Sequence, residues 1–290
     1  MRVGFAGIGS MGWPMAANLA RKGFDLTVFD VDAGRSREFA ETIGGRPGTL
    51  AALAGCDCVI AMLPTGAHVR ELLLEQDGSA FLQANPKAIV VDMSSSEPAG
   101  TRSLGTELAK HGVIFLDAPV SGAVPRAETA TLAIMVGGED DEAIARVEPV
   151  LRAMGDRIFR TGPLGSGHAT KALNNFLAGA GLAAASEALT IGRRFGLDPE
   201  TLIDIVNVST GRNFATEALM KQHVLSGAFS SGFSLGLLAK DVGIAAGLAR
   251  DLGIDAPVTA LVSARFDEAR DKLGPGVDNS ALIKAWDDSI

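Results

Sequence analysis

The pattern of the sequence changes once, near residue 163, and this change constrains the fold more than any other feature. Before it, short apolar runs typical of strands alternate with amphipathic stretches typical of helices. Such alternation indicates βαβ units, which build a mostly parallel sheet with helices on both faces. After it, only long helical patterns follow. We therefore predict an α/β domain with a doubly wound sheet at residues 1–163 and an all-α domain at residues 164–290.

The individual elements follow from the same patterns. A long helix at residues 169–195 is expected to join the two domains. Other helices are predicted at 15–22, 33–41, 69–74, 100–110 and 141–154. The predicted strands are 3–8, 26–30, 57–63, 88–92, 113–117, 132–136 and 157–159.

Gly7, Gly9 and Gly12 form a G-x-G-x-x-G motif between the first predicted strand and the first predicted helix. Alone the motif is a weak signal, because glycine supplies 35 of the 290 residues. Its position is more informative, since a glycine turn there lets backbone amides approach a pyrophosphate at a helix N-terminus. We therefore expect a Rossmann-type domain that binds a dinucleotide, with Ser10 in the same turn. Methyltransferases and binding-only proteins use similar turns, so the motif does not define the chemistry.

Asp30 ends the second predicted strand, 18 residues after Gly12. An acid at that point can accept hydrogen bonds from both ribose hydroxyls and repel a 2′-phosphate. Asp30 therefore favours NAD over NADP. Arg35 follows five residues later and could accommodate that phosphate, although a solvated helix residue is its simpler role.

The composition argues against several classes of protein. The formal net charge is −8 and no basic block stands out, so nucleic acid and anionic membranes are not expected partners. Cys56 and Cys58 form a C-x-C pair, but no other cysteine or nearby histidine completes a metal site. The few cysteines fit a reducing compartment, and signal-peptide and membrane-span patterns are missing. We expect a cytoplasmic protein without a metal.

Two segments carry candidate site residues. Ser121, Gly122 and Ala123 follow a predicted strand and could hold a carboxylate, although the segment by itself is better explained as an ordinary Ser-Gly turn. Lys171, Asn174 and Asn175 share one face of the long helix. A lysine at a domain junction is a candidate general acid/base, because partial desolvation lowers the pKa of an ammonium group.

Two further residues have competing interpretations. His168, one turn before Lys171, is a rival acid/base, although we expect it to line the entrance or to cap the helix. Lys240 precedes Asp241 in a later apolar helix. This pair is either a surface ion pair or a lysine that reaches the cofactor beside an aspartate that anchors local structure.

Four segments together resemble the sequence blocks of the β-hydroxyacid dehydrogenase family, which includes 3-hydroxyisobutyrate dehydrogenase and tartronate semialdehyde reductase. They are "GFAGIGSMGWPMAANL", "DAPVSGAVPRAETATLAIMVGG", "GSGHATKALNN" and "FSLGLLAKDVGIA". The segments "MLPTGAHV" and "VDMSSSEP" are also similar to the cofactor-domain segments of that family. The similarity runs in order over nearly the whole chain.

The resemblance implies an NAD-dependent oxidoreductase that moves a hydride between the nicotinamide and a small 3-hydroxy acid or its semialdehyde. It implies that Lys171 is the catalytic lysine and Asn175 its supporting asparagine. It places the substrate at Ser121, Gly122, Ala123 and Asn174, and the cofactor at Gly9, Met11, Leu63, Pro64, Ser95 and Lys240. Ala123 departs from the usual glycine and Ser95 from the common threonine, and the first departure puts the substrate in doubt.

Other functions remain open. An imine reductase on the same scaffold usually lacks the lysine, and a non-catalytic dinucleotide-binding relative is expected to lose it, so Lys171 argues against both. We expect a homodimer or homotetramer that binds a small carboxylate-bearing substrate. The physiological substrate and the direction of the reaction stay open.

Overall fold

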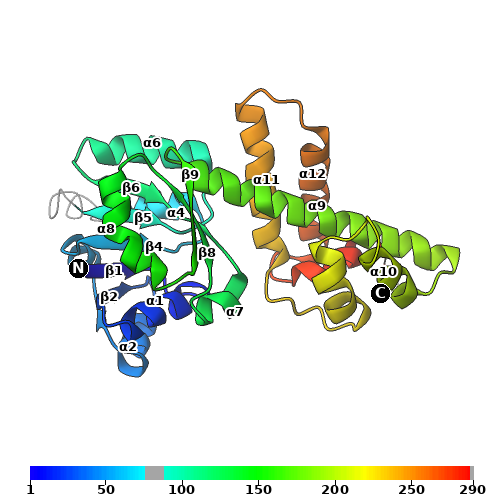
Figure 1. Ribbon diagram of the computed structural model, residues 1–290, viewed down its shortest axis with the longest axis horizontal. Helices are drawn as coiled ribbons and strands as arrows, with labels where there is room; N and C mark the ends of the chain where they lie inside the picture. Colours follow the sequence, from blue (N-terminus) through cyan, green and yellow to red (C-terminus); the bar gives the residue numbers. More distant parts are fainter. Residues whose placement is uncertain (76–87, 288–290) are drawn as a thin grey trace. The chain divides into compact units, whose positions relative to one another are not determined.

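The computed structural model describes residues 1–75 and 88–287 (Figure 1). The chain forms two compact units, Met1–Lys171 and Ala172–Ile290. The first unit contains the sheet, and every element that the structure describes in the second unit is a helix. This arrangement confirms the predicted fold class, an α/β doubly wound domain followed by an all-α domain.

The sheet of the first unit has the strand order β3-β2-β1-β4-β5-β6-β8-β7, and β9 pairs with β8. Neighbouring strands from β3 to β6 are parallel, whereas β8 runs antiparallel to β6 and β7. The bounds are β1 (Arg2–Ala6), β2 (Asp25–Phe29), β3 (Arg46–Pro47), β4 (Cys58–Ala61), β5 (Ile89–Asp92), β6 (Ile114–Asp117), β7 (Val120–Ser121), β8 (Ala133–Gly137) and β9 (Arg157–Gly162).

Both faces of this sheet are covered. Cys58 and Ile60 of β4 belong to one apolar cluster, and Val59 and Ala61 belong to another, because successive side chains of a strand point to opposite faces. The first cluster includes residues of α1 (Gly12–Arg21), α2 (Ala33–Thr42), α7 (Ala123–Glu128) and α8 (Asp141–Arg152). The second includes residues of α3 (Leu50–Ala54), α4 (Gly66–Arg70), the π-helical turn η1 (Glu71–Glu75) and α6 (Pro98–Ala109).

The sequence patterns miss β3 and β7, which have two residues each. Two residues are too few to display the period-2 alternation by which a strand is recognised. The helix predicted at residues 69–74 is divided between α4 and η1. Every other predicted element of the first unit overlaps an observed element of the same type.

The second unit packs its helices around Leu182, Met220, Val242, Phe266 and Leu282. Gly179 allows a close approach, since a Cβ built there would lie 2.9 Å from the Val242 side chain. The elements are α9 (Ser166–Phe195), which begins in the first unit, α10 (Pro199–Asn207), the π-helical η2 (Ala215–Leu225), α11 (Leu235–Asp251), α12 (Pro257–Leu273) and the 3₁₀-helical η3 (Asn279–Ala285). Within the described part of the chain, no helix is both long and apolar enough to cross a membrane.

Candidate active site

The glycine turn connects β1 to α1 and is shaped by backbone proximity. Gly7 has a φ of 90°, in the region that favours glycine. A Cβ on Gly12 would lie 1.9 Å from the carbonyl oxygen of Gly7, so any larger residue would push the turn apart. A Cβ on Gly9, in contrast, would meet no atom within 4 Å. The backbone of the turn is therefore closely packed at Gly7 and Gly12. The space beside Gly9 is open, as the approach of a pyrophosphate requires.

Asp30 braces this turn from the end of β2. Its Oδ2 accepts a hydrogen bond from the amide of Ile8 at 3.0 Å, and its Oδ1 accepts one from the amide of Asp32 at 3.0 Å. Arg35 lies 3.6 Å from the same carboxylate. The sequence motif did not indicate the bracing contact, because it joins two segments 22 residues apart.

Two further loops follow strands that lie beside β1 in the sheet. Leu63 and Pro64 come after β4, and Ser95 comes after β5. The amide of Leu63 donates a hydrogen bond to Oγ of Ser94 at 2.9 Å, which ties the two loops together. Because β1, β4 and β5 are parallel, these loops and the glycine turn lie at the same edge of the sheet. This edge is where doubly wound sheets bind dinucleotides, so the residues present fit such a cofactor.

The segment predicted to hold the substrate begins in β7. Ser121 pairs with Ala133 of β8, and Gly122 and Ala123 begin α7. Gly122 has a φ of 137° and Ala123 a φ of 53°. A left-handed conformation costs a non-glycine residue about 1–2 kcal/mol. Ala123 therefore occupies a position whose backbone suits glycine better, and this is the position where the sequence departs from the family pattern.

Polar side chains of α9 and α11 meet inside the second unit. Nδ2 of Asn175 donates a hydrogen bond to Oδ2 of Asp241 at 2.5 Å, and both residues are buried. Nδ2 of Asn174 lies 3.1 Å from Oδ1 of Asn175. Nζ of Lys240 lies 3.3 Å from the second oxygen of Asp241. Asp241 therefore fixes the amide of Asn175 and the ammonium group of Lys240.

Lys171 lies on the same helix, one turn before Asn175. It is the last residue of the first unit and its side chain is partly buried. Residues at i and i+4 of a helix point to the same side, so Lys171 and Asn175 share a face of α9.

His168 differs from its expected place at the entrance. It is buried, and Nδ1 lies 2.8 Å from Oγ1 of Thr101. The cap of the helix is instead Asp117, which accepts hydrogen bonds from the amides of Gly165 at 2.7 Å and His168 at 2.8 Å. Sequence reasoning missed this cluster, although an aspartate ending a predicted strand was its available signal.

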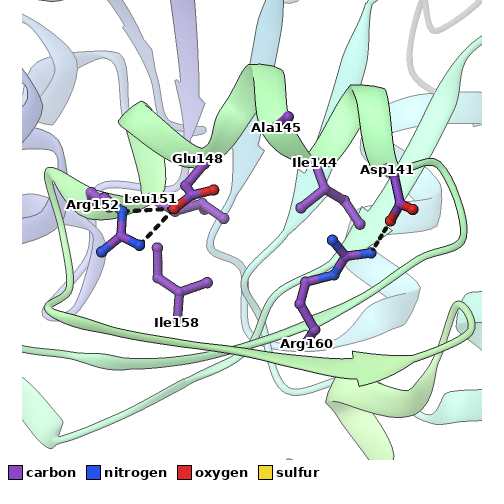
Figure 2. Close-up of a pocket in the computed structure, with 8 residues that line it drawn as sticks. All are labelled: Asp141, Ile144, Ala145, Glu148, Leu151, Arg152, Ile158 and Arg160. Carbon is purple, nitrogen blue, oxygen red and sulfur yellow. Dashed lines mark hydrogen bonds and ion pairs between the residues drawn. The ribbon is translucent and has the colours of Figure 1, made fainter.

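A shallow pocket lies apart from these residues, between α8 and β9 (Figure 2). Ion pairs Arg152–Glu148 and Arg160–Asp141 stand on either side of Ile144 and Ile158. Because both guanidinium groups already have acidic partners and none of the predicted site residues lines the pocket, it does not belong to the candidate active site.

The surroundings of the two cysteines do not favour a nucleophilic role. Both are buried thiols, and burial raises the pKa of Cys58 to about 12. A thiol with so high a pKa is protonated at neutral pH, and the thiolate is the reactive form. Among the residues that the structure describes, no group of three or more histidine, cysteine or acidic side chains is placed to hold a metal.

A parallel sheet, an open glycine turn and two loops at one sheet edge define a dinucleotide-binding protein of the kind found among oxidoreductases. Comparison with known proteins agrees with this class. Residues 2–162 match the family described as the NAD binding domain of 6-phosphogluconate dehydrogenase. Residues 165–286 match the family described as NAD-binding of NADP-dependent 3-hydroxyisobutyrate dehydrogenase.

Similar proteins cover nearly the whole chain. The 3-hydroxyisobutyrate dehydrogenase of Pseudomonas aeruginosa is 36% identical, over 98% of both chains. The 2-(hydroxymethyl)glutarate dehydrogenase of Eubacterium barkeri is 35% identical, over 99% of this chain and 95% of its own. A solved structure of Mycobacterium tuberculosis 3-hydroxyisobutyrate dehydrogenase with L-serine has a TM-score of 0.88 and 32% identity, over 98% of both chains. The chain belongs to the β-hydroxyacid dehydrogenase family. It is an NAD-binding hydroxyacid dehydrogenase, which confirms the class of enzyme and cofactor expected from the sequence.

Proposed function

We propose that this enzyme transfers a hydride between NAD and a small 3-hydroxy acid or the corresponding semialdehyde, with Lys171 as the general acid/base. The observation that carries the proposal is the shared face of α9. Lys171 and Asn175 lie one turn apart on it, and Asp241 holds the Asn175 amide in one orientation. An amide fixed in this way can position an amine or a substrate hydroxyl, whereas a solvated surface lysine would need no such partner.

The substrate class is supported by a chemical feature that the relatives' substrates have in common. The names of two relatives and the ligand of a solved structure refer to 3-hydroxyisobutyrate, 2-(hydroxymethyl)glutarate and L-serine. Each has a CH₂OH group attached directly to a carbon that bears a carboxylate. In our proposal, Ser121 and the neighbouring amides of Gly122 and Ala123 bind that carboxylate, and Asn174 contributes a further polar contact. Binding the carboxylate places the alcohol carbon for reaction.

The cofactor would be held at the glycine turn by Gly7, Gly9, Ser10, Met11 and Gly12. Leu63, Pro64, Ser95 and Lys240 would supply the remaining contacts, with Asp30 behind the turn. When bound, NAD accepts or returns the hydride. In oxidation, Nζ of Lys171 takes the proton of the substrate hydroxyl, and in reduction it returns that proton to the carbonyl oxygen. Asn175 holds the lysine or the substrate in position by hydrogen bonding.

The proposal is tested by the absorbance of NADH during incubation with a panel of acids. We expect turnover with 3-hydroxyisobutyrate-like acids and L-serine, and none with 2-hydroxy acids or with simple alcohols that lack the carboxylate. The reverse reaction should occur with the matching semialdehydes. Turnover with cyclic imines and none with any 3-hydroxy acid would reject the proposal.

Cofactor preference is expected to change at Val31. Its side chain is 87% exposed directly after Asp30, at the end of β2 where such domains bind the adenosine ribose. The acidic side chain of Asp30 makes NAD the expected cofactor, and Arg35 is paired with that carboxylate at 3.6 Å. Val31→Arg should improve kcat/KM for NADP relative to NAD by about ten-fold or more, because a guanidinium group pairs with a 2′-phosphate. Steady-state kinetics with both cofactors measure this, and Val31→Gln, which adds no charge, should leave the ratio unchanged. An equal gain in both variants would contradict the electrostatic explanation.

We also propose that the chain forms a homodimer or homotetramer through α9. Leu173, Leu177, Ile191 and Phe195 lie along this helix with side chains 48%, 68%, 68% and 83% exposed. The pairs 173–177 and 191–195 have the i, i+4 spacing of one helix face. Contiguous apolar surface of this kind marks an interface in a soluble protein, and homo-oligomers use the same patch on both copies.

Charge placed on this face should separate the subunits. The double variant Leu177→Glu, Ile191→Glu is expected to reduce the mass measured by light scattering to that of one chain, because paired carboxylates at an interface are desolvated. Val31→Gln, which changes an exposed residue of the first unit, should retain the mass of the unaltered protein. An unaltered protein that is monomeric at micromolar concentration would refute the interface.

A further inference from the structure

His168 lies in the first turn of α9, three residues before Lys171, and contacts groups from two other parts of the first unit. Its side chain is 0% exposed. Nε2 lies 3.7 Å from Oδ2 of Asp92, and Nδ1 lies 3.8 Å from Oδ2 of Asp117. Both aspartates end parallel strands, β5 and β6, so the imidazole lies at the sheet edge that carries the cofactor loops.

The Asp92 side of this cluster leads to the cofactor loops. Oδ1 of Asp92 accepts a hydrogen bond from the amide of Ser94 at 2.9 Å, and Oδ2 accepts one from the hydroxyl of Ser96 at 2.9 Å. The hydroxyl of Ser94 in turn accepts a hydrogen bond from the backbone amide of Leu63. A continuous path of polar contacts therefore joins the loop after β4, the loop after β5 and the imidazole.

The Asp117 side leads to the start of α9. Asp117 accepts hydrogen bonds from the backbone amides of Gly165 and His168, so it fixes the first turn of the helix. No space remains for adjustment there, because a Cβ on Gly167 would lie 2.8 Å from Oδ2 of Asp117 and 2.2 Å from the carbonyl oxygen of Met135.

The two nitrogens of the imidazole have different surroundings, and these indicate which of its contacts holds Asp92 in place. The hydroxyl of Thr101 lies 2.8 Å from Nδ1 and 3.1 Å from the carbonyl oxygen of Glu97. When this hydroxyl donates to Nδ1, the neutral imidazole carries its single N–H at Nε2. Nε2 is buried and has no hydrogen-bond partner among the described residues, and the carboxylate of Asp92 faces it. An N–H at this position attracts that carboxylate, whereas a bare lone pair would oppose it.

We propose that His168 is a positioning residue for the reaction. Through Asp92 it holds the loops at Leu63 and Ser94 in register with the first turn of α9, and thereby sets the position of Lys171. The inference rests on the proposed function of Lys171, but the coupling itself is a property of the first unit. All of the contacts involved lie within residues 1–171.

The test compares His168→Leu, which cannot donate to Asp92, with His168→Gln, whose amide can reach the position of Nε2. Hydrogen exchange is followed in the protein without cofactor. In the leucine variant we expect peptides covering 60–66 and 164–170 to exchange about ten-fold faster or more, because the buried carboxylate of Asp92 then faces an apolar side chain in place of the imidazole. The glutamine variant should restore slow exchange in both. Thr101→Val, which removes only the partner of Nδ1, should have a smaller effect in the same direction and serves if the leucine variant does not fold.

Leu151→Ala is the matched control. Leu151 is buried in α8, outside the cluster, and its truncation leaves a cavity that lowers global stability without removing a polar contact. Faster exchange in the histidine variant than in this control therefore reports a local effect.

Kinetics supply the second readout. In His168→Leu we expect kcat to fall about ten-fold or more, while KM for the hydroxy acid changes less than about three-fold, because Lys171 is displaced and the carboxylate site at Ser121 is untouched. The glutamine variant should recover most of kcat. Exchange at Leu63 equal to that of the control, or unchanged kcat in a folded leucine variant, would overturn the inference. If the unaltered protein oxidises none of the acids, the proposed function fails, and hydrogen exchange still decides whether His168 couples the two segments.

Discussion

Lys171→Ala is expected to reduce kcat/KM for the hydroxy acid by about 10²–10⁴-fold, the range attributed to a positioned general acid/base. Methyl cannot accept the hydroxyl proton, so the alkoxide character that hydride transfer needs would have to develop without assistance. NADH binding, measured by fluorescence, should survive the change, because Lys171 is not among the residues that we propose as cofactor contacts. The loss should appear in kcat more than in the affinity for the cofactor.

Lys171→Arg is the matched control for charge. Arginine retains the positive charge but does not give up its proton in proteins, so it should be nearly as inactive as alanine. Substantial activity in the arginine variant would mean that position 171 acts only by electrostatic attraction of the carboxylate. Near-normal turnover in Lys171→Ala would remove the lysine from the mechanism altogether.

Gly9→Ala is expected to weaken cofactor binding in a fully folded protein. The added Cβ would meet no protein atom within 4 Å, and the φ of Gly9 is not in the left-handed region, so the chain itself accommodates alanine. The methyl group instead occupies the space through which a pyrophosphate approaches the backbone. We expect the Kd for NADH to rise about ten-fold or more, equivalent to about 1.4 kcal/mol, with no loss of thermal stability.

Two other glycines separate the cofactor effect from a folding effect. Gly12→Ala should lower the melting temperature, because its Cβ would lie 1.9 Å from the carbonyl oxygen of Gly7. Gly276→Ala, in the second unit, also adds a methyl group that meets no atom within 4 Å and should change neither property. Unchanged NADH affinity in Gly9→Ala would mean that the open space beside this glycine does not bind the cofactor.

The fold was largely predictable because its signals are local. Strand and helix patterns alternate in the first unit with enough residues per element to display their periods, and the change to purely helical patterns places the second unit. Gly7, Gly9 and Gly12 were recognisable because their spacing and their neighbours in sequence are fixed by the turn they form. Strands β3 and β7 were not recognisable, since two residues show no period.

The candidate site was predictable only as a set of residue types. That Lys171 and Asn175 share a helix face follows from spacing alone. The partners of Asn175 and His168 do not follow from spacing, because Asp241 is 66 residues from Asn175 in sequence and Asp117 is 51 residues from His168. The left-handed φ of Ala123 could not be predicted either, because alanine is uncommon in that conformation and does not indicate it. The roles assigned to the site residues stay predictions until the variants are measured.

The hydrogen bond from the amide of Ile8 to Asp30 has a consequence for how nucleotide preference can change in this enzyme. Replacing Asp30 to admit a 2′-phosphate would release the backbone at the tip of the first strand, so selectivity and integrity of the fold would be lost together. The side chain of Val31 is exposed and does not brace the backbone in this way. Variation in coenzyme use among descendants of this chain should therefore accumulate at residue 31 while the neighbouring acid, or another side chain able to accept the same amide, is retained.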